Sequence, residues 1–132
     1  MHRSTNMDIS VLLIEDEMDI AEMYRIRLIA DGYSVLVANT GEDGVRLAVE
    51  ALPDFIYLDL GLPGGVDGFQ VLDLLLSSPK TQSTPIVILT NYDDPAMRTR
   101  GLRLGAVEFM LKAATTPSQL STAVRRTTSV FA

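Results

Sequence analysis

The chain of 132 residues contains no cysteine. This absence excludes disulfide frameworks, thiolate metal sites and cysteine nucleophiles, and it is compatible with the cytoplasm. The longest apolar runs are strand-sized, well short of the ~20 residues that a membrane-spanning helix needs. Basic residues are a minority, with 11 against 17 acidic ones and a net charge of −6. Because a phosphate backbone would be repelled, the chain is not expected to bind nucleic acid directly.

The composition is that of one globular domain. Hydrophobic residues make up 47% of the chain and charged residues 21%, which supports a core of ordinary size without disulfides. We expect the domain to span residues 9–128, with a disordered lead at 1–8 and a short tail at 129–132. The polar lead lacks the apolar core of a signal peptide.

Five short apolar runs alternate with segments of helical periodicity. This alternation predicts a single doubly wound α/β domain, with a five-stranded parallel sheet covered by helices on both faces. The predicted strands are Val11–Ile14, Ser34–Ala38, Phe55–Asp59, Ile86–Thr90 and Val107–Leu111. The predicted helices run approximately over Asp19–Ala30, Thr40–Ala51, Phe69–Leu76, Pro95–Leu104 and Thr116–Thr127.

Cap and stop residues mark several helix ends. Asp19 is predicted to cap the first helix, and Gly32 is predicted to stop it in a left-handed conformation. Pro53 blocks continuation of the second helix. Thr116, followed by a proline and then by Gln119, predicts a capping box at the start of the last helix.

Polar residues follow the predicted strands at their carboxyl ends, the edge where open α/β sheets bind ligands. Glu15 and Asp16 follow the first strand and Asp59 ends the third. Thr90 ends the fourth strand, and Lys112 follows the fifth. Crowded carboxylates raise one another's pKa unless something neutralises them, and their hard oxygens suit a small divalent cation such as Mg²⁺.

These side chains fit phosphoryl chemistry. An aspartate can attack phosphorus and form an acyl phosphate, and catalysis then consists mainly of positioning and charge stabilisation. Asp59 is the candidate nucleophile because it stands alone at its strand end, whereas Glu15 and Asp16 are placed to hold the cation. The Lys112 ammonium and the Thr90 hydroxyl can donate to phosphoryl oxygens.

The motifs at these strand ends resemble those of receiver domains of bacterial two-component response regulators. The resemblance covers Val11 to about Thr127. It rests on Leu12-Leu13-Ile14-Glu15-Asp16-Glu17, Leu58-Asp59-Leu60-Gly61-Leu62-Pro63 followed by Asp67-Gly68-Phe69, Ile88-Leu89-Thr90, Gly105-Ala106 and Phe109-Met110-Leu111-Lys112. It implies the flavodoxin-like (βα)5 fold with strand order 2-1-3-4-5.

The resemblance also implies a role for each matched residue. Asp59 is implied to be the phosphoacceptor, which takes its phosphoryl group from a sensor histidine kinase or a phosphotransfer protein. The implied ligands of Mg²⁺ or Mn²⁺ are Asp16, Glu15, Asp59 and the backbone carbonyl of Gly61. The implied phosphoryl-binding and switch residues are Thr90, Lys112 and Phe109. We count Asn91, next to Thr90, with these phosphoryl-binding candidates, because it is placed to narrow the access of water to the phosphoryl group.

The implied function is a signalling switch and not an enzyme, apart from Mg²⁺-dependent self-phosphorylation and autodephosphorylation at Asp59. Phosphorylation would change the surface that is offered to a downstream effector protein or domain. The family uses its fourth helix, fifth strand and fifth helix for output. The arginines on these helices either form a solvated face or contact an acidic partner or a second copy of the chain; they are Arg98, Arg100, Arg103, Arg125 and Arg126. The chain is compatible either with a standalone regulator or with a receiver from a longer protein.

Three departures from the family pattern lie near the phosphoacceptor. Ala113 and Ala114 follow Lys112, where the family usually has proline. The loop at Gly64-Gly65 is one residue longer than usual, and Asn91 replaces a small residue. The lifetime of the phosphoryl group therefore cannot be carried over from the family.

Three other functions compete with the switch. A receiver-like adaptor that docks a partner without phosphorylation is left open by these departures. A phosphatase with an aspartyl nucleophile would need a general acid at position 61, which is a glycine. A flavin-binding protein would need a glycine- and hydroxyl-rich phosphate loop after the first strand, where Glu15-Asp16-Glu17 would repel the phosphate.

Overall fold

The computed structural model describes residues 9–62 and 65–128, so our expectations for the lead at 1–8 and the tail at 129–132 lie outside the described residues. Five parallel strands form one sheet in the order β2-β1-β3-β4-β5, as the resemblance implied. The strands are β1 Ser10–Ile14, β2 Ser34–Ala38, β3 Phe55–Leu58, β4 Ile86–Thr90 and β5 Glu108–Leu111. The helices are α1 Met18–Ala30, α2 Gly41–Ala51, α3 Gly68–Ser77, α4 Pro95–Leu104 and α5 Pro117–Thr128, with a short 3-10 turn at Lys112–Ala114.

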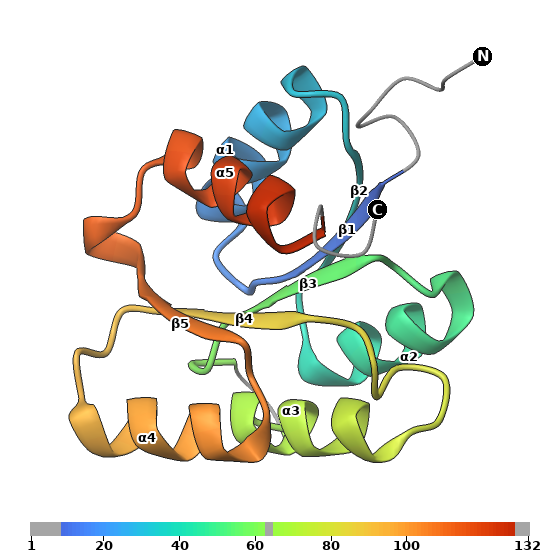
Figure 1. The fold of residues 1–132 in the computed structure, drawn as a ribbon, viewed down its shortest axis with the longest axis vertical. Helices are drawn as coiled ribbons and strands as arrows, with labels where there is room; N and C mark the ends of the chain where they lie inside the picture. Colours follow the sequence, from blue (N-terminus) through green and yellow to red (C-terminus); the bar gives the residue numbers. More distant parts are fainter. Residues whose placement is uncertain (1–8, 63–64, 129–132) are drawn as a thin grey trace.

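Helices cover both faces of the sheet, α1 and α5 on one side and α2, α3 and α4 on the other (Figure 1). Successive strand residues point to opposite faces, so Val11 and Leu13 pack in the core under α1 and α5, whereas Leu12 and Ile14 pack in the second core. Because both faces are covered, β3 is buried along its whole length. No helix within the described ranges is long and apolar enough to cross a membrane.

The predicted helix ends are mostly confirmed. Gly32 has a φ of 96°, the left-handed conformation expected after α1. Thr116 and Gln119 form the reciprocal bonds of a capping box. The prediction for Asp19 was wrong: the Glu15 carboxylate accepts the Glu17 N–H at 3.0 Å, so the chain turns into α1 directly after the strand, with Glu17 at the cap position. Asp19 lies in the first turn instead, where it favours the helix dipole.

Gly68 holds the loop after β3 close to the start of α3. A Cβ at this position would lie 2.4 Å from the Leu60 Cα and 2.8 Å from the Asp59 carbonyl oxygen, both backbone atoms. We expect Gly68→Ala to lower the free energy of unfolding by about 1–3 kcal/mol, measured by urea denaturation, because the backbone has to move. Gly65→Ala is the matched control and should stay within about 0.5 kcal/mol, since no heavy atom of the described residues lies within 4 Å of a Cβ built there. Equal losses in the two variants would contradict this explanation.

Candidate functional site

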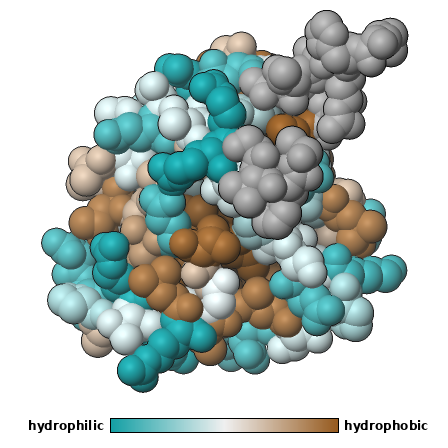
Figure 2. Space-filling view, viewed as in Figure 1, coloured by the Kyte–Doolittle hydropathy of each residue, from teal (hydrophilic) through white to brown (hydrophobic). Residues whose placement is uncertain are grey.

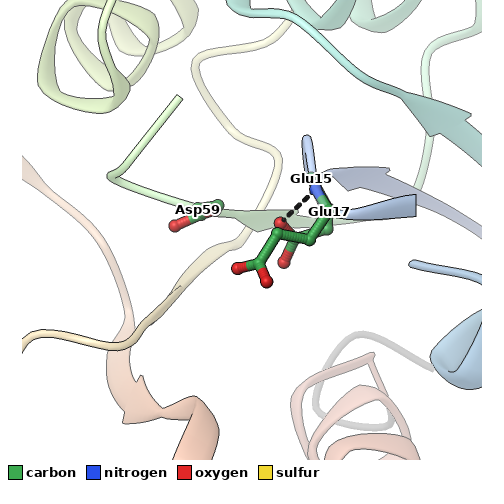
Figure 3. Close-up of side chains that lie close together, drawn as sticks. All are labelled: Glu15, Glu17 and Asp59. Atoms are coloured by element: carbon green, nitrogen blue, oxygen red, sulfur yellow. Dashed lines mark hydrogen bonds between the residues drawn. The ribbon is translucent and has the colours of Figure 1, made fainter. Parts of the chain in front are cut away.

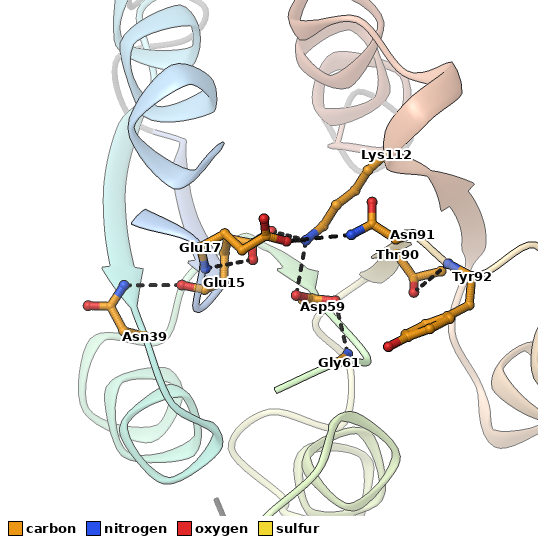
Figure 4. A network of polar contacts seen from close by, with 9 residues as sticks. All are labelled: Glu15, Glu17, Asn39, Asp59, Gly61, Thr90, Asn91, Tyr92 and Lys112. Carbon is orange, nitrogen blue, oxygen red and sulfur yellow. Dashed lines mark hydrogen bonds and ion pairs between the residues drawn. The ribbon is translucent and has the colours of Figure 1, made fainter. Parts of the chain in front are cut away.

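The candidate site lies at the carboxyl edge of the parallel sheet, among residues that end or follow the strands (Figure 4). The parallel register pairs Ile14 with Leu58, and the residues that follow them are Glu15 and Asp59. Thr90 ends β4 beside Leu111 of β5, and the next residue along that strand is Lys112. Register alone therefore brings together polar residues that lie far apart in the sequence.

The Lys112 ammonium is surrounded by three carboxylates. Its Nζ lies 2.5 Å from Glu15 Oε1, 3.0 Å from Asp59 Oδ2 and 3.3 Å from Glu17 Oε1. The side chains of Lys112, Glu15 and Asp59 are all buried, whereas that of Glu17 is 48% exposed. Buried charges are tolerated only when paired, so the lysine and the two buried acids depend on one another.

Burial and the opposing charges shift the pKa values of this group. Burial raises the pKa of Glu15 to about 7, and the adjacent Lys112 ammonium only partly opposes it. Burial would lower the pKa of Lys112, but its bonds to Glu15 and Asp59 outweigh burial and raise the pKa above its ordinary value. The pKa of Asp16 is also raised, by desolvation first and then by the neighbouring Asp59 carboxylate. Burial is thus the main cause of the raised pKa values of Glu15 and Asp16, and the Asp59 carboxylate adds to both.

The acidic side chains can accommodate a divalent cation. One carboxylate oxygen each from Glu15, Glu17 and Asp59 lies within 4.8 Å of the others (Figure 3). Within the described residues, buried Glu15 Oε1 accepts no hydrogen bond of ordinary geometry, although the Lys112 ammonium is close. Hard, anionic oxygens in this arrangement are the ligands that Mg²⁺ prefers.

The gathered acids differ in one respect from those that the sequence singled out. Glu17 joins Glu15 and Asp59 in the group of close carboxylate oxygens. Asp16 is not in that group, but the neighbouring Asp59 carboxylate contributes to its raised pKa. The contact made by Gly61 in the structure is through its N–H, which donates to Asp59 Oδ1 at 3.0 Å. The three consecutive acids after β1, Glu15-Asp16-Glu17, were a sequence signal from which Glu17 could have been predicted as a site residue.

The other predicted site residues, Thr90, Asn91 and Phe109, differ in burial and in their contacts. Thr90 is fully buried, and its hydroxyl accepts the Tyr92 N–H at 3.2 Å. Asn91 is exposed and donates to Glu17 Oε1 over 3.5 Å. Phe109 is buried in the core below α4, with the Arg98 guanidinium 5.8 Å from its ring centroid. Phe109 is therefore not a member of the carboxylate group.

Sequence reasoning missed two further residues beside the site. Tyr92 places its ring next to Gly61: a Cβ on that glycine would lie 3.5 Å from the ring and 3.6 Å from Asp59 Oδ1. Asn39, at the end of β2, donates its side-chain amide to the Glu15 carbonyl at 3.1 Å. The position of Asn39 at a strand end was available as a signal, whereas nothing in the sequence indicates where the Tyr92 ring points.

Comparison with known proteins gives a consistent family match. Residues 11–125 match the response regulator receiver domain family. The chain is 39% identical over 103 residues to the transcriptional regulatory protein AfsQ1 of Streptomyces coelicolor, covering 78% of this chain and 44% of that protein. It is 33% identical to protein PilH of Pseudomonas aeruginosa, covering 77% and 84%. The chain thus spans less than half the length of AfsQ1 but most of PilH.

Solved structures give the same result. Chemotaxis protein CheY4 of Vibrio cholerae superposes with a TM-score of 0.82 at 27% identity, covering 89% of this chain and 97% of that chain. The signal receiver domain of a signal transduction histidine kinase from Syntrophus aciditrophicus gives 0.82 at 29% identity, covering 92% and 90%. On the sequence match and on these folds, the chain belongs to the response regulator receiver domain family.

Proposed function

We propose that the chain is the phosphoacceptor switch of a two-component phosphorelay and that Asp59 takes the phosphoryl group. One observation carries this proposal. The buried Asp59 carboxylate is fixed at both oxygens, by the Gly61 N–H on Oδ1 and by Lys112 on Oδ2, at the open edge of the sheet. A nucleophile held in this way needs little reorganisation before it attacks.

In the proposed reaction, an Asp59 oxygen forms a bond to phosphorus while the phosphorus–nitrogen bond of a phosphohistidine breaks. The bonding pair leaves on the imidazole nitrogen, which takes up a proton. Lys112 neutralises charge on the phosphoryl oxygens, and the Thr90 hydroxyl can donate to one of them. The donor is a sensor histidine kinase or a phosphotransfer protein, and we place the domain in the cytoplasm.

Mg²⁺ or Mn²⁺ would be held by Glu15, Asp16, Asp59 and the Gly61 carbonyl. When bound, the cation offsets the negative charge shared by the carboxylates and the phosphoryl group. This assignment is supported by the close carboxylate oxygens, and by the pKa values of Glu15 and Asp16, which burial raises first and the neighbouring Asp59 carboxylate raises further.

Output is proposed to pass through α4, β5 and α5. If Thr90 turns from the Tyr92 N–H towards a phosphoryl group, the packing around Phe109 below α4 can follow, and this changes the population of surface states. Hydrophobic residues lie among hydrophilic ones on the face seen in Figure 2. The stretch from α4 to β5 exposes Leu102, Leu104 and Val107. An effector protein or domain, or a second copy of the chain, would dock there.

The direct test is incubation with acetyl phosphate and Mg²⁺, followed by intact mass and peptide mapping. We expect the mass of one phosphoryl group to be added, and peptide mapping to locate it on Asp59. No mass gain is expected when Mg²⁺ is left out of the reaction. Beryllofluoride with Mg²⁺ should shift the NMR signals of Thr90 and Phe109. A chain that gains no mass and shows no shift with either reagent would refute the proposal.

The affinity for Mg²⁺ is expected to depend on pH through Glu15. Its pKa of about 7 means that most of the carboxyl is protonated at pH 6 and ionised at pH 8. Because the cation must displace that proton, we expect binding about tenfold weaker at pH 6 than at pH 8, measured by NMR titration. Glu15→Gln should remove the dependence, whereas Glu22→Gln, on the exposed face of α1, should retain it. A wild-type affinity that is constant over this range would contradict the assignment.

A further inference from the structure

Glu17 lies beside Glu15 and Asp59 (Figure 3), and its side chain contacts two donor groups, those of Lys112 and Asn91 (Figure 4). Its Oε1 is 3.3 Å from the Lys112 Nζ and 3.5 Å from the Asn91 Nδ2. The Glu17 side chain is 48% exposed, whereas that of Lys112 is 4% exposed. Glu17 Oε1 therefore accepts hydrogen bonds from two donors at once, the buried Lys112 ammonium and the exposed Asn91 amide.

The Lys112 ammonium already contacts three anions: it donates hydrogen bonds to Asp59 and Glu17, and it lies 2.5 Å from Glu15 Oε1 in an ion pair. An ammonium has three N–H groups and no acceptor, and the three carboxylates of Glu15, Asp59 and Glu17 surround it. A phosphoryl oxygen on Asp59 could be bound by Lys112 only if one of these acceptors left. Glu15 and Asp59 are buried, and each has a second backbone bond through its other oxygen. Glu17 is the acceptor that can leave at the lowest cost.

We propose that Glu17 is a positioning residue that occupies the phosphoryl-binding donors of Lys112 and Asn91 until a phosphoryl group displaces it. This inference rests on the proposed function of Asp59. The Glu17 N–H stays bonded to Glu15 Oε2, so only the side chain has to rotate into solvent. The exchange replaces one anion by another at the same donors. The Glu17 carboxylate therefore competes with the incoming phosphoryl group and slows phosphorylation.

A different role for Glu17 would be direct cation binding, because its carboxylate lies within 4.8 Å of those of Glu15 and Asp59. The two roles make opposite predictions. Removing a competing anion speeds phosphoryl uptake and leaves the cation affinity nearly unchanged. Removing a metal ligand weakens cation binding and slows phosphoryl uptake. The contacts favour the first role, because Glu17 Oε1 already accepts a hydrogen bond from Lys112.

The test compares Glu17→Gln with Glu22→Gln in the full chain. Both remove one carboxylate from the start of α1; Glu22 is 52% exposed and pairs with Arg25, away from the site. At saturating Mg²⁺ we expect Glu17→Gln to be phosphorylated by acetyl phosphate about three- to fivefold faster than wild type, the range for a partly exposed ion pair. The beryllofluoride concentration at half saturation should fall by the same factor. Glu22→Gln should match wild type, and the Mg²⁺ dissociation constant of Glu17→Gln should change less than about twofold.

Three results would overturn the inference. These are a wild-type rate in Glu17→Gln, an equal acceleration in Glu22→Gln, or a loss of Mg²⁺ affinity of about tenfold or more in Glu17→Gln. If no variant takes a phosphoryl group or beryllofluoride, the proposed function of Asp59 fails instead. The hydrogen bond between Asn91 and Glu17 is then tested by NMR: the side-chain amide signals of Asn91 should shift in Glu17→Gln and not in Glu22→Gln. Unchanged Asn91 signals would overturn the inference in that case too.

Discussion

Asp59→Asn is expected to abolish phosphoryl uptake from acetyl phosphate, with a loss of several orders of magnitude in rate. The amide keeps the shape of the carboxylate and one oxygen that can accept the Gly61 N–H. It lacks the anionic oxygen that attacks phosphorus, and amides are poor nucleophiles. The measurement is the intact mass of the protein after incubation with acetyl phosphate and Mg²⁺.

The matched control is Asp73→Asn, an exposed acid on α3 that should leave uptake unchanged. Retained mass gain in Asp59→Asn would show that another acid, such as Glu15 or Asp16, is the acceptor. The same variant separates the switch from the adaptor in cells. If signalling survived Asp59→Asn undiminished, docking without phosphorylation would be the function.

The site was predictable as far as it depends on strand ends. Asp59, Thr90 and Lys112 could be found because apolar runs define the strands, and parallel strands bring their carboxyl ends to one edge. The error of one residue at the end of β3 had no effect on this result, since the structure ends the strand at Leu58 and Asp59 follows directly. Helix placement was predictable from the same periodicity, whereas the confirmed sheet order came from the resemblance to the family.

Features that depend on turns and side-chain rotation were not predictable. Glu17 enters the site because the Glu15 carboxylate bonds the Glu17 N–H and so starts α1 at Met18. Hydrophobic periodicity contains no information on such a bond. The ring of Tyr92 beside Gly61 likewise depends on the backbone path after β4. Both residues lie in short connections, where local hydrogen bonds decide direction.

Lys112→Met is expected to lower the free energy of unfolding by about 3–5 kcal/mol at pH 8 in the absence of Mg²⁺, because it leaves Glu15 and Asp59 buried without a counter-charge. Lys80→Met makes the same chemical change at an exposed position and should stay within about 0.5 kcal/mol of wild type. Urea denaturation of both variants measures the difference. Equal stability of Lys112→Met and Lys80→Met would show that the ammonium is not the counter-charge.

The loss in Lys112→Met should depend on pH and on Mg²⁺ in a defined direction. The hydrogen bond from Lys112 holds down the pKa of Glu15, which burial already raises to about 7, so removing the lysine raises it further. A carboxyl with a raised folded-state pKa stabilises the fold while it is protonated, and that stability is lost as pH rises through the folded-state pKa. The deficit should therefore be small near pH 5 and grow above pH 7. Millimolar Mg²⁺ should restore part of it, since a cation that binds only the folded state replaces the missing positive charge.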